Sequence, residues 1–273
     1  MENLRAISLA LRMDIINTIY RAKAGHIGGD LSVTDILVTL YYKHLNISPQ
    51  TVQDPKRDRF VLSKGHCVEA LYAVLAGRGF LPREDLGKVY QFGSPYIGHP
   101  SNKIPGIEMN SGSLGHGLSV CVGMALAGKL DKADYRVYTV MGDGELAEGS
   151  VWEGVMAASH YKLDNLCAVV DRNGLQISGT TETVMSQGDL ASRWSSFGWN
   201  VIHVNGHDID SLDAAFVESK AHKGTPSVII ADTVKGYGVS FMENNLKWHH
   251  RAPTEAEYLA AMNELEQRRL AVS

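Results

Sequence analysis

The chain contains 273 residues with a formal net charge of -4, and 44% of its residues are hydrophobic. A chain of this length can bury a sizeable core, and this composition is typical of a soluble globular protein. The small net charge gives no reason to expect a nucleic acid or an anionic membrane as partner. The longest apolar run, residues 118–127, is too short to span a bilayer.

The N-terminus, MENLRAISLALRMD, lacks the apolar core and the cleavage site of a signal peptide. Three cysteines lie far apart in apolar surroundings: Cys67, Cys121 and Cys167. Isolated cysteines of this kind are typical of free thiols in a reducing compartment. We therefore expect a cytoplasmic protein.

Helical and strand patterns alternate along the chain. Leu4 to Ile19 show apolar residues on one helical face, and Ser32-x-x-Asp35 resembles a capping box before a second helix. Further helices are expected over 68–76, 117–128, 151–161 and 209–221, with a last one capped by Thr254-x-x-Glu257. Apolar, β-branched runs predict strands over 135–141, 166–170, 201–205 and 227–231.

This alternation predicts an α/β fold with a mostly parallel central sheet and helices on both faces. No repeat, low-complexity tract or linker divides the sequence, so we expect a single domain over residues 1–273. Ligands of such folds bind beyond the carboxyl ends of the strands.

Two polar signals stand at expected strand ends. Asp143 lies between Gly142 and Gly144 after one apolar run, and Asn173 follows the next run. Asp-Gly alone is an ordinary turn, and Asn-Gly alone is an ordinary hairpin turn. One crossover apart, however, they place a carboxylate, an amide oxygen and the Leu175 carbonyl at one sheet edge. Such hard oxygen ligands suit Mg²⁺ bound to a diphosphate.

At these residues the sequence resembles a known family. Gly142-Asp143-Gly144 followed by Asn173 resembles the thiamine diphosphate motif, and GDGELAEGSVWE with VDRNGLQISG resembles transketolases in particular. The resemblance extends over residues 24–253 and implies the diphosphate-binding domain of the thiamine diphosphate-binding fold. It implies Asp143, Asn173 and the Leu175 carbonyl as ligands of Mg²⁺ (or Ca²⁺ or Mn²⁺). The implied cofactor-binding residues are His66, Gly112, Ser113, Leu114, Gly142, Asp143, Gly144, Glu145, Asn173, Lys235 and His249.

Several of the eleven histidines lie in glycine-rich segments, and their spacing matches no zinc motif. The resemblance implies that His26, His66 and His99 line a substrate channel and bind hydroxyl groups. It also brings one histidine of the doublet His249–His250 to the reacting carbon. The related pattern Trp-His-Gly-x-Ala-Pro favours His249, whereas counting back from Ala-Pro favours His250.

Other positions admit two interpretations or depart from the family pattern. Glu148 is expected as a carboxylate in the first turn of a helix. The resemblance also implies that it belongs to an acid network at a subunit interface, and both interpretations can hold. Lys235 either contacts the diphosphate or caps a strand loop. Ile27 stands where the family commonly has a proline, and His116 stands where it commonly has a glutamine. His116 is either a new polar contact or neutral variation.

The resemblance also shows what is missing. In transketolases the carboxylate that activates the cofactor pyrimidine lies in a later pyrimidine-binding domain, which is followed by a C-terminal domain. We expect both on a separate, complementary chain, in an α2β2 assembly. A truncated piece of a longer chain is the alternative.

The sequence therefore predicts a thiamine diphosphate- and magnesium-dependent transferase subunit that is active only with its complementary chain. Its reaction moves a two-carbon ketol unit from a ketose, or its phosphate, to an aldose, as in pentose phosphate metabolism. The alternatives are half of a 1-deoxyxylulose-5-phosphate synthase-like or 2-oxoacid dehydrogenase-like enzyme, or a non-catalytic interaction protein of the same fold. The physiological sugar stays open.

Overall fold

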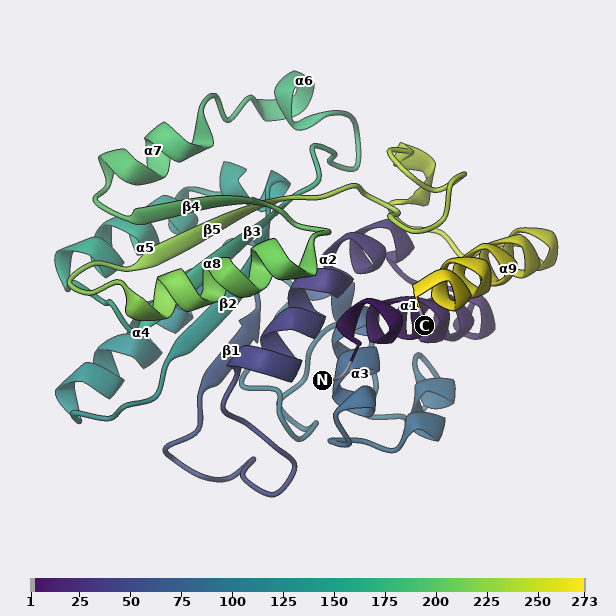
Figure 1. The fold of residues 1–273 in the computed structure, drawn as a ribbon, viewed down its shortest axis with the longest axis horizontal. Helices are drawn as coiled ribbons and strands as arrows, with labels where there is room; N and C mark the ends of the chain where they lie inside the picture. The colour runs from purple at the N-terminus through teal and green to yellow at the C-terminus, as the bar shows by residue number, and fades with distance from the viewer. Residues whose placement is uncertain (1–2, 273) are drawn as a thin grey trace.

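The computed structural model describes residues 3–272, which contain one five-stranded sheet (Figure 1). Its strands are β1 (Arg59–Leu62), β2 (Val137–Gly142), β3 (Leu166–Arg172), β4 (Asn200–Asn205) and β5 (Ser227–Asp232). Their order is β1-β2-β3-β5-β4, and every neighbouring pair is parallel. The predicted α/β class with a parallel sheet is confirmed.

The strand β1 was not expected from the sequence. It is only four residues long, and it follows the charged stretch DPKRD, so it lacks the long apolar run that marked the other strands. Asp58 stabilises its start, because its carboxylate accepts hydrogen bonds from the backbone N–H groups of Asn46 and Arg136. The Arg136 bond attaches β1 to the start of β2.

Helices cover both faces of the sheet. They are α1 (Leu4–Ala22), α2 (Ile27–Thr39), α3 (Val68–Gly77), α4 (Gly117–Leu130), α5 (Gly149–His160), α6 (Thr181–Met185), α7 (Leu190–Ser196), α8 (Ile209–Ala221) and α9 (Glu255–Val272). Along β3, Cys167 and Val169 pack into the cluster that contains α1, α2, α3 and α8. Ala168 and Val170 pack into the cluster that contains α4, α5 and α7. Figure 1 shows α8 in front of the sheet and α4 and α5 behind it.

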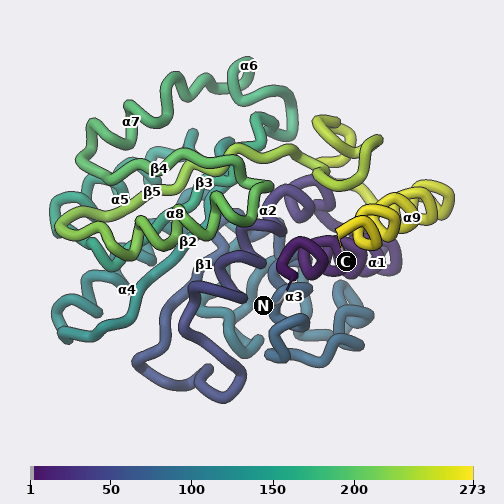
Figure 2. Tube along the Cα trace, viewed as in Figure 1, coloured from purple at the N-terminus to yellow at the C-terminus, as the bar shows by residue number. Residues whose placement is uncertain are grey.

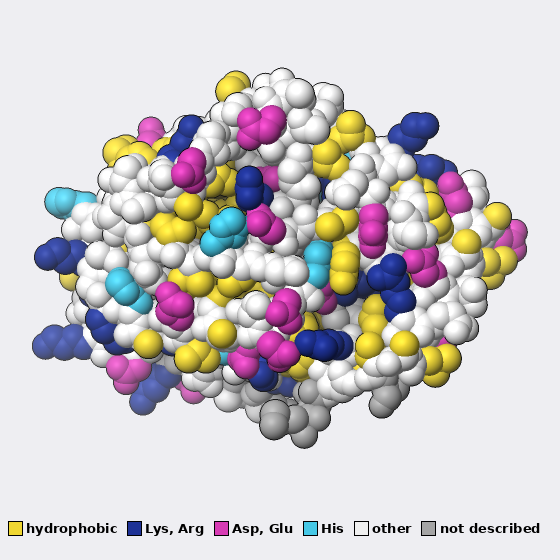
Figure 3. Space-filling model, turned by 45° about the horizontal axis from the view of Figure 1, so that its top comes forward, with side chains coloured by type: hydrophobic (Ala, Val, Ile, Leu, Met, Phe, Trp, Pro, Cys, Tyr) yellow, Lys and Arg dark blue, Asp and Glu magenta, His cyan; other side chains and the backbone are white. Residues whose placement is uncertain are grey.

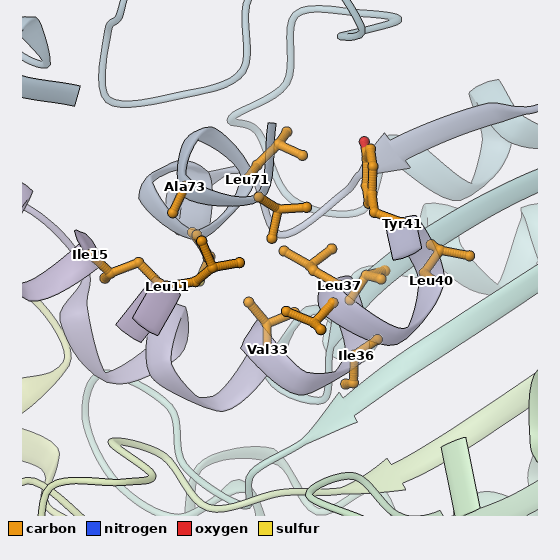
Figure 4. Close-up of a cluster of buried hydrophobic side chains, with 14 of the residues drawn as sticks. Leu11, Ile15, Val33, Ile36, Leu37, Leu40, Tyr41, Leu71 and Ala73 are labelled. Atoms are coloured by element: carbon orange, nitrogen blue, oxygen red, sulfur yellow. The ribbon is translucent and has the colours of Figure 1, made fainter. Parts of the chain in front are cut away.

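The expected capping box at Ser32 and Asp35 is wrong. The helix α2 begins at Ile27, so both residues lie inside it, and every residue of α2 is buried. Packing against α1 and α3 therefore decides where this helix begins: Leu11, Val33 and Leu71 come from the three helices and meet in one apolar cluster (Figure 4). The carboxylate of Asp35 forms a buried ion pair with Arg12 at 2.7 Å instead.

The last helix, α9, lies beside α1, and the two ends of the described chain meet there (Figures 1 and 2). Tyr20 and Tyr258 stack with ring centroids 4.2 Å apart. The predicted cap of α9 is confirmed, because Thr254 N–H donates to Glu257 and Glu257 N–H donates to the Thr254 hydroxyl.

Acidic and basic side chains are interspersed on the face shown in Figure 3. Within residues 3–272, no helix is both long enough and apolar enough to cross a bilayer. The three cysteines are buried free thiols, as predicted.

Candidate functional site

A cavity of about 400 Å³ opens at the carboxyl ends of β2 and β3. Most of the predicted site residues line it: His26, His66, Gly112, Leu114, Gly142, Asp143, Gly144, Glu145, Asn173, Leu175, Lys235 and His249. They come from segments far apart in the sequence. The parallel sheet brings these segments together at one edge, where ligands of such folds bind.

Asp143 follows the last residue of β2, and its carboxylate is held by backbone groups. Its Oδ1 accepts from Gly144 N–H at 2.8 Å, and its Oδ2 accepts from Gly174 N–H at 2.6 Å. The side chain is buried, and this burial raises the pKa of Asp143 to about 6. A cation beside the carboxylate would remove much of this desolvation cost.

The second half of the predicted ligand set follows β3. Because Gly142 pairs with Asp171 in the sheet, the two strands end side by side. Asn173 is buried, and its side-chain oxygen accepts from Leu175 N–H at 3.1 Å. Asp143, Asn173 and Leu175 thus bring a carboxylate, an amide and a carbonyl oxygen to one cavity, a donor set that suits a hard cation.

No group of three or more His, Cys, Asp or Glu side chains within residues 3–272 is arranged to hold a metal ion. A cation at Asp143 therefore needs the neutral oxygens of Asn173 and Leu175 and oxygens of a ligand. That division is usual for Mg²⁺ bound together with substrate phosphates. The residues present fit a metal–diphosphate group.

Two buried lysines line the cavity. Lys64 forms an ion pair with Asp171, which also accepts from Ser32 at 2.7 Å and from Thr233. Lys235 also lines the cavity, and burial together with the charge of Lys64 lowers its pKa. Lys64 was not expected from the sequence, although it directly precedes the Gly-His pair of the segment SKGH.

The imidazole rings of His26, His66 and His249 gather at one part of the cavity, with centroids 5.1 to 5.7 Å apart. Burial, reinforced by neighbouring positive charges, lowers the pKa of His26 to about 4 and that of His249 to about 3. The rings are therefore neutral at pH 7. Within the described chain, the buried Nδ1 atoms of His26 and His249 have no hydrogen-bond partner.

The structure places the two histidines of the doublet differently. His249 is partly buried and lines the cavity, whereas His250 is exposed and lies outside the lining. The His250 ring nevertheless lies 4.5 Å from that of His26. The geometry thus favours His249 as the residue that faces a bound ligand.

Three predicted site residues lie outside the lining. The ring of His99 is half-buried and lies against the lining residue Gly112, where a β-carbon would come within 3.0 Å of it. Ser113 is exposed. Glu148 is also exposed and precedes α5 without a side-chain hydrogen bond to the helix end. The variant position His116 is exposed at the start of α4.

Glu145 is buried and holds two backbone segments in place. Its carboxylate accepts from Gly115 N–H at 2.9 Å, from Gly142 N–H at 3.1 Å and from the Ser63 hydroxyl. Burial raises its pKa. Glu145 therefore connects the glycine-rich loop before α4 to the end of β2. The neighbouring lining residues Gln176, Ile177 and Ser178 were not expected from the sequence.

Comparison with known proteins identifies transketolases as relatives of this chain. The family model described as "Transketolase, thiamine diphosphate binding domain" matches residues 3–266. One subunit of the apulose-4-phosphate transketolase of Phocaeicola vulgatus is 50% identical over 267 residues, covering 98% of this chain and 95% of that protein. The 6-deoxy-6-sulfo-D-fructose transketolase subunit of a Clostridium species is 40% identical over 257 residues, covering 94% of each.

Solved structures show the same fold. The transketolase from Campylobacter jejuni superposes with a TM-score of 0.91 at 29% sequence identity, over 100% of this chain and 46% of that chain. The present chain thus spans less than half the length of that transketolase.

Proposed function

Since the chain belongs to the transketolase family and corresponds to its thiamine diphosphate-binding N-terminal part, we propose that it acts with a complementary subunit. The pair transfers a two-carbon ketol unit from a ketose phosphate to an aldose phosphate. The observation that carries this proposal is the convergence of Asp143, Asn173, Leu175 and the two buried lysines on one cavity.

Thiamine diphosphate supplies the carbanion and the electron sink that this chemistry needs. In this chain, Asp143, Asn173 and the Leu175 carbonyl would bind the magnesium ion of its diphosphate. Gly142 presents open space toward the cavity, since nothing lies within 4 Å of a β-carbon built there, and diphosphate oxygens can approach its backbone. Lys235 adds positive charge beside the diphosphate.

The neutral histidines bind and orient the sugar. A neutral imidazole has one donor and one acceptor nitrogen, so a set of imidazoles can hold several hydroxyl groups of a ketose at once. His26, His66 and His99 would take this role, and His249 would face the reacting carbon. Because these rings carry no charge at neutral pH, they can both accept and donate protons at the hydroxyl groups.

A complementary subunit is part of the proposal. The relatives of similar length carry "subunit" in their names, and the longer Campylobacter transketolase extends well beyond the matched region. We expect that subunit to contribute the carboxylate that activates the cofactor pyrimidine, to cover the open cavity and to bind the substrate phosphate, in an α2β2 assembly.

The test is a transfer assay with thiamine diphosphate and Mg²⁺. The chain is assayed alone and with its co-purified partner, using ketose phosphates as donors and aldose phosphates as acceptors. We expect activity only in the complex. An active chain on its own would contradict the two-subunit proposal, and a complex that uses a 2-oxoacid donor instead of a ketose would contradict the reaction.

The matched variants are Asp143→Asn and Asp131→Asn. Asp131 is an exposed carboxylate at the end of α4 and serves as control. We expect Asp143→Asn to weaken Mg²⁺-dependent cofactor binding at least about 100-fold, because a charged metal ligand becomes neutral, while far-ultraviolet circular dichroism stays unchanged. Unchanged cofactor affinity in this variant would overturn the metal assignment.

A further inference from the structure

Two buried carboxyl groups lie behind the histidine part of the cavity. Asp30 is in the first turn of α2 and is fully buried, and Glu69 is in the first turn of α3 and is 1% exposed. Asp30 Oδ1 accepts from Ala70 N–H at 2.9 Å, and Glu69 Oε1 accepts from the Tyr90 hydroxyl at 2.9 Å. Buried acids of this kind are rare unless they are paired.

The two carboxyl groups interact electrostatically with each other. Burial and the neighbouring charge of Glu69 raise the pKa of Asp30 well above its usual value, and burial raises the pKa of Glu69 to about 7. The oxygens without a hydrogen-bond partner are Asp30 Oδ2 and Glu69 Oε2. A proton on Asp30 that is shared with Glu69 would remove the repulsion between two carboxylates.

Glu69 and Tyr90 also contact the backbone directly before two channel histidines. A β-carbon at Gly25, which precedes His26, would lie 2.6 Å from Glu69 Oε1. A β-carbon at Gly98, which precedes His99, would lie 2.6 Å from the Tyr90 ring. Glu69 packs against Gly25, Tyr90 packs against Gly98, and the two side chains are hydrogen-bonded to each other. This contact chain therefore fixes the distance between the backbone segments that carry His26 and His99.

Further bonds hold the same loop. Tyr72, one turn after Glu69 on α3, donates its hydroxyl to the Ile97 carbonyl at 3.0 Å. Tyr90 has a φ of 64°, a left-handed conformation that is costly for a bulky residue, and its N–H donates to the Tyr96 carbonyl at 2.9 Å. Surrounding contacts must hold such a residue in place, and the Glu69 bond is one of them.

We propose that Asp30, Glu69 and Tyr90 are positioning residues that set the separation of His26 and His99, and so fix how the chain binds the hydroxyl groups of the donor ketose. None of the three lines the cavity, so they act through the histidines. This inference rests on the proposed function, because it takes both histidines as sugar ligands.

The groups that face the carboxyl pair decide its pH dependence. These groups are Lys64, Cys67, Tyr72 and Tyr90. The charge of Lys64 lowers the pKa of Asp30. Burial raises the pKa values of Cys67, Tyr72 and Tyr90, and the charge of Glu69 raises those of the two tyrosines further. Among these groups of the described chain, Lys64 carries the positive charge that opposes the two carboxyl groups. Above neutral pH, ionisation of both acids would leave like charges in apolar surroundings and loosen the loop.

The test compares Tyr90→Phe with Tyr96→Phe. Both changes remove one hydroxyl from the same loop, but Tyr96 donates to Asp85, away from the histidines. In the complex we expect Tyr90→Phe to raise the ketose KM about tenfold, since small displacements of binding groups have large effects, with cofactor affinity unchanged. Tyr96→Phe should stay within about twofold of the wild type on both measures.

A second pair tests the shared proton. In Glu69→Gln, the amide still accepts from Tyr90 and donates to Asp30, so we expect a ketose KM near that of the wild type at neutral pH. Above neutral pH, the KM of this variant should increase less than that of the wild type. Glu69→Leu removes both bonds and should behave like Tyr90→Phe. Equal effects of Gln and Leu would overturn the hydrogen-bonded network.

Hydrogen exchange of the full chain separates this inference from the proposed function. We expect faster amide exchange at residues 97–99 in Tyr90→Phe than in Tyr96→Phe. Equal exchange in the two variants would overturn the network, and faster exchange with an unchanged ketose KM would overturn its positioning role. If the wild-type complex transfers no two-carbon unit while exchange follows the expectation, the proposed function fails and the network stands as a structural restraint.

Discussion

The two ends of the cavity are held in place in different ways. At the strand end, the Asp143 carboxylate bonds to the backbone of Gly144 and Gly174, next to the β2–β3 pairing. At the histidine end, the glycines before His26 and His99 contact Glu69 and Tyr90, which belong to other parts of the chain. The first arrangement follows from strand register, and the second from a buried network of side chains.

This difference explains which parts of the site could be predicted from the sequence. Asp143 and Asn173 each follow an apolar run, and parallel strands place the ends of such runs together, so their proximity follows from local patterns. Nothing comparable marks Asp30 and Glu69. Both lie in helices that are almost entirely buried, and only tertiary packing brings their carboxyl groups together.

The same contrast applies to the fold. The helix α8 occupies 209–221 as predicted, because its apolar spacing is clear and Asp208 caps it. The strand β1 and the start of α2 were missed, because packing decides both. Lys64 was missed because its partner, Asp171, is more than one hundred residues away. Sequence patterns thus predict the elements, while long-range polar pairs need the structure.

The largest expected effect comes from breaking the buried ion pair between Lys64, which directly precedes the segment of His66, and Asp171, at the end of β3. Lys64→Met leaves Asp171 buried without its cation, and we expect a loss of about 3–5 kcal/mol in the free energy of unfolding, because an unpaired buried charge is costly. Urea denaturation monitored by fluorescence measures it.

Two further variants sharpen this prediction. Lys56→Met removes an exposed lysine and should change the free energy of unfolding by less than about 0.5 kcal/mol. Lys64→Met combined with Asp171→Asn removes both charges and should recover part of the loss. A single variant as stable as the wild type would show that the pair contributes no net stability.

A smaller effect is expected from acidification of the histidine end. The folded chain holds His26 and His249 with lowered pKa values, about 4 and about 3, mainly because of burial. The unfolded chain binds these protons first, near pH 6.5, so stability is full above that pH and declines as the pH falls toward 4. We expect the melting temperature to fall over this range.

Replacing one ring isolates its contribution. His249→Asn should flatten the decline of the melting temperature between pH 6.5 and pH 4, because one of the titrating groups is gone. His160→Asn removes an exposed histidine at the end of α5 and should leave the decline as it is in the wild type. Identical pH profiles for all three proteins would contradict the assignment of the acid sensitivity to the buried rings.

The smallest effect separates ligand binding at the strand end from folding. Gly142→Ala adds a methyl group where nothing lies within 4 Å, so the free energy of unfolding should change by less than about 0.5 kcal/mol. The same methyl group projects into space that we assign to the diphosphate. We therefore expect the affinity for thiamine diphosphate, measured by calorimetry with Mg²⁺, to fall about tenfold, or about 1.4 kcal/mol.

A second glycine provides the control for this variant. Gly149→Ala, at the start of α5, also meets open space but lies outside the cavity lining, so it should change neither quantity. If both variants bind the cofactor like the wild type, the diphosphate does not lie against Gly142. If Gly142→Ala loses stability and affinity together, the fold requires a glycine at this position. Ligand binding and folding would then be coupled at the strand end, contrary to the comparison drawn above.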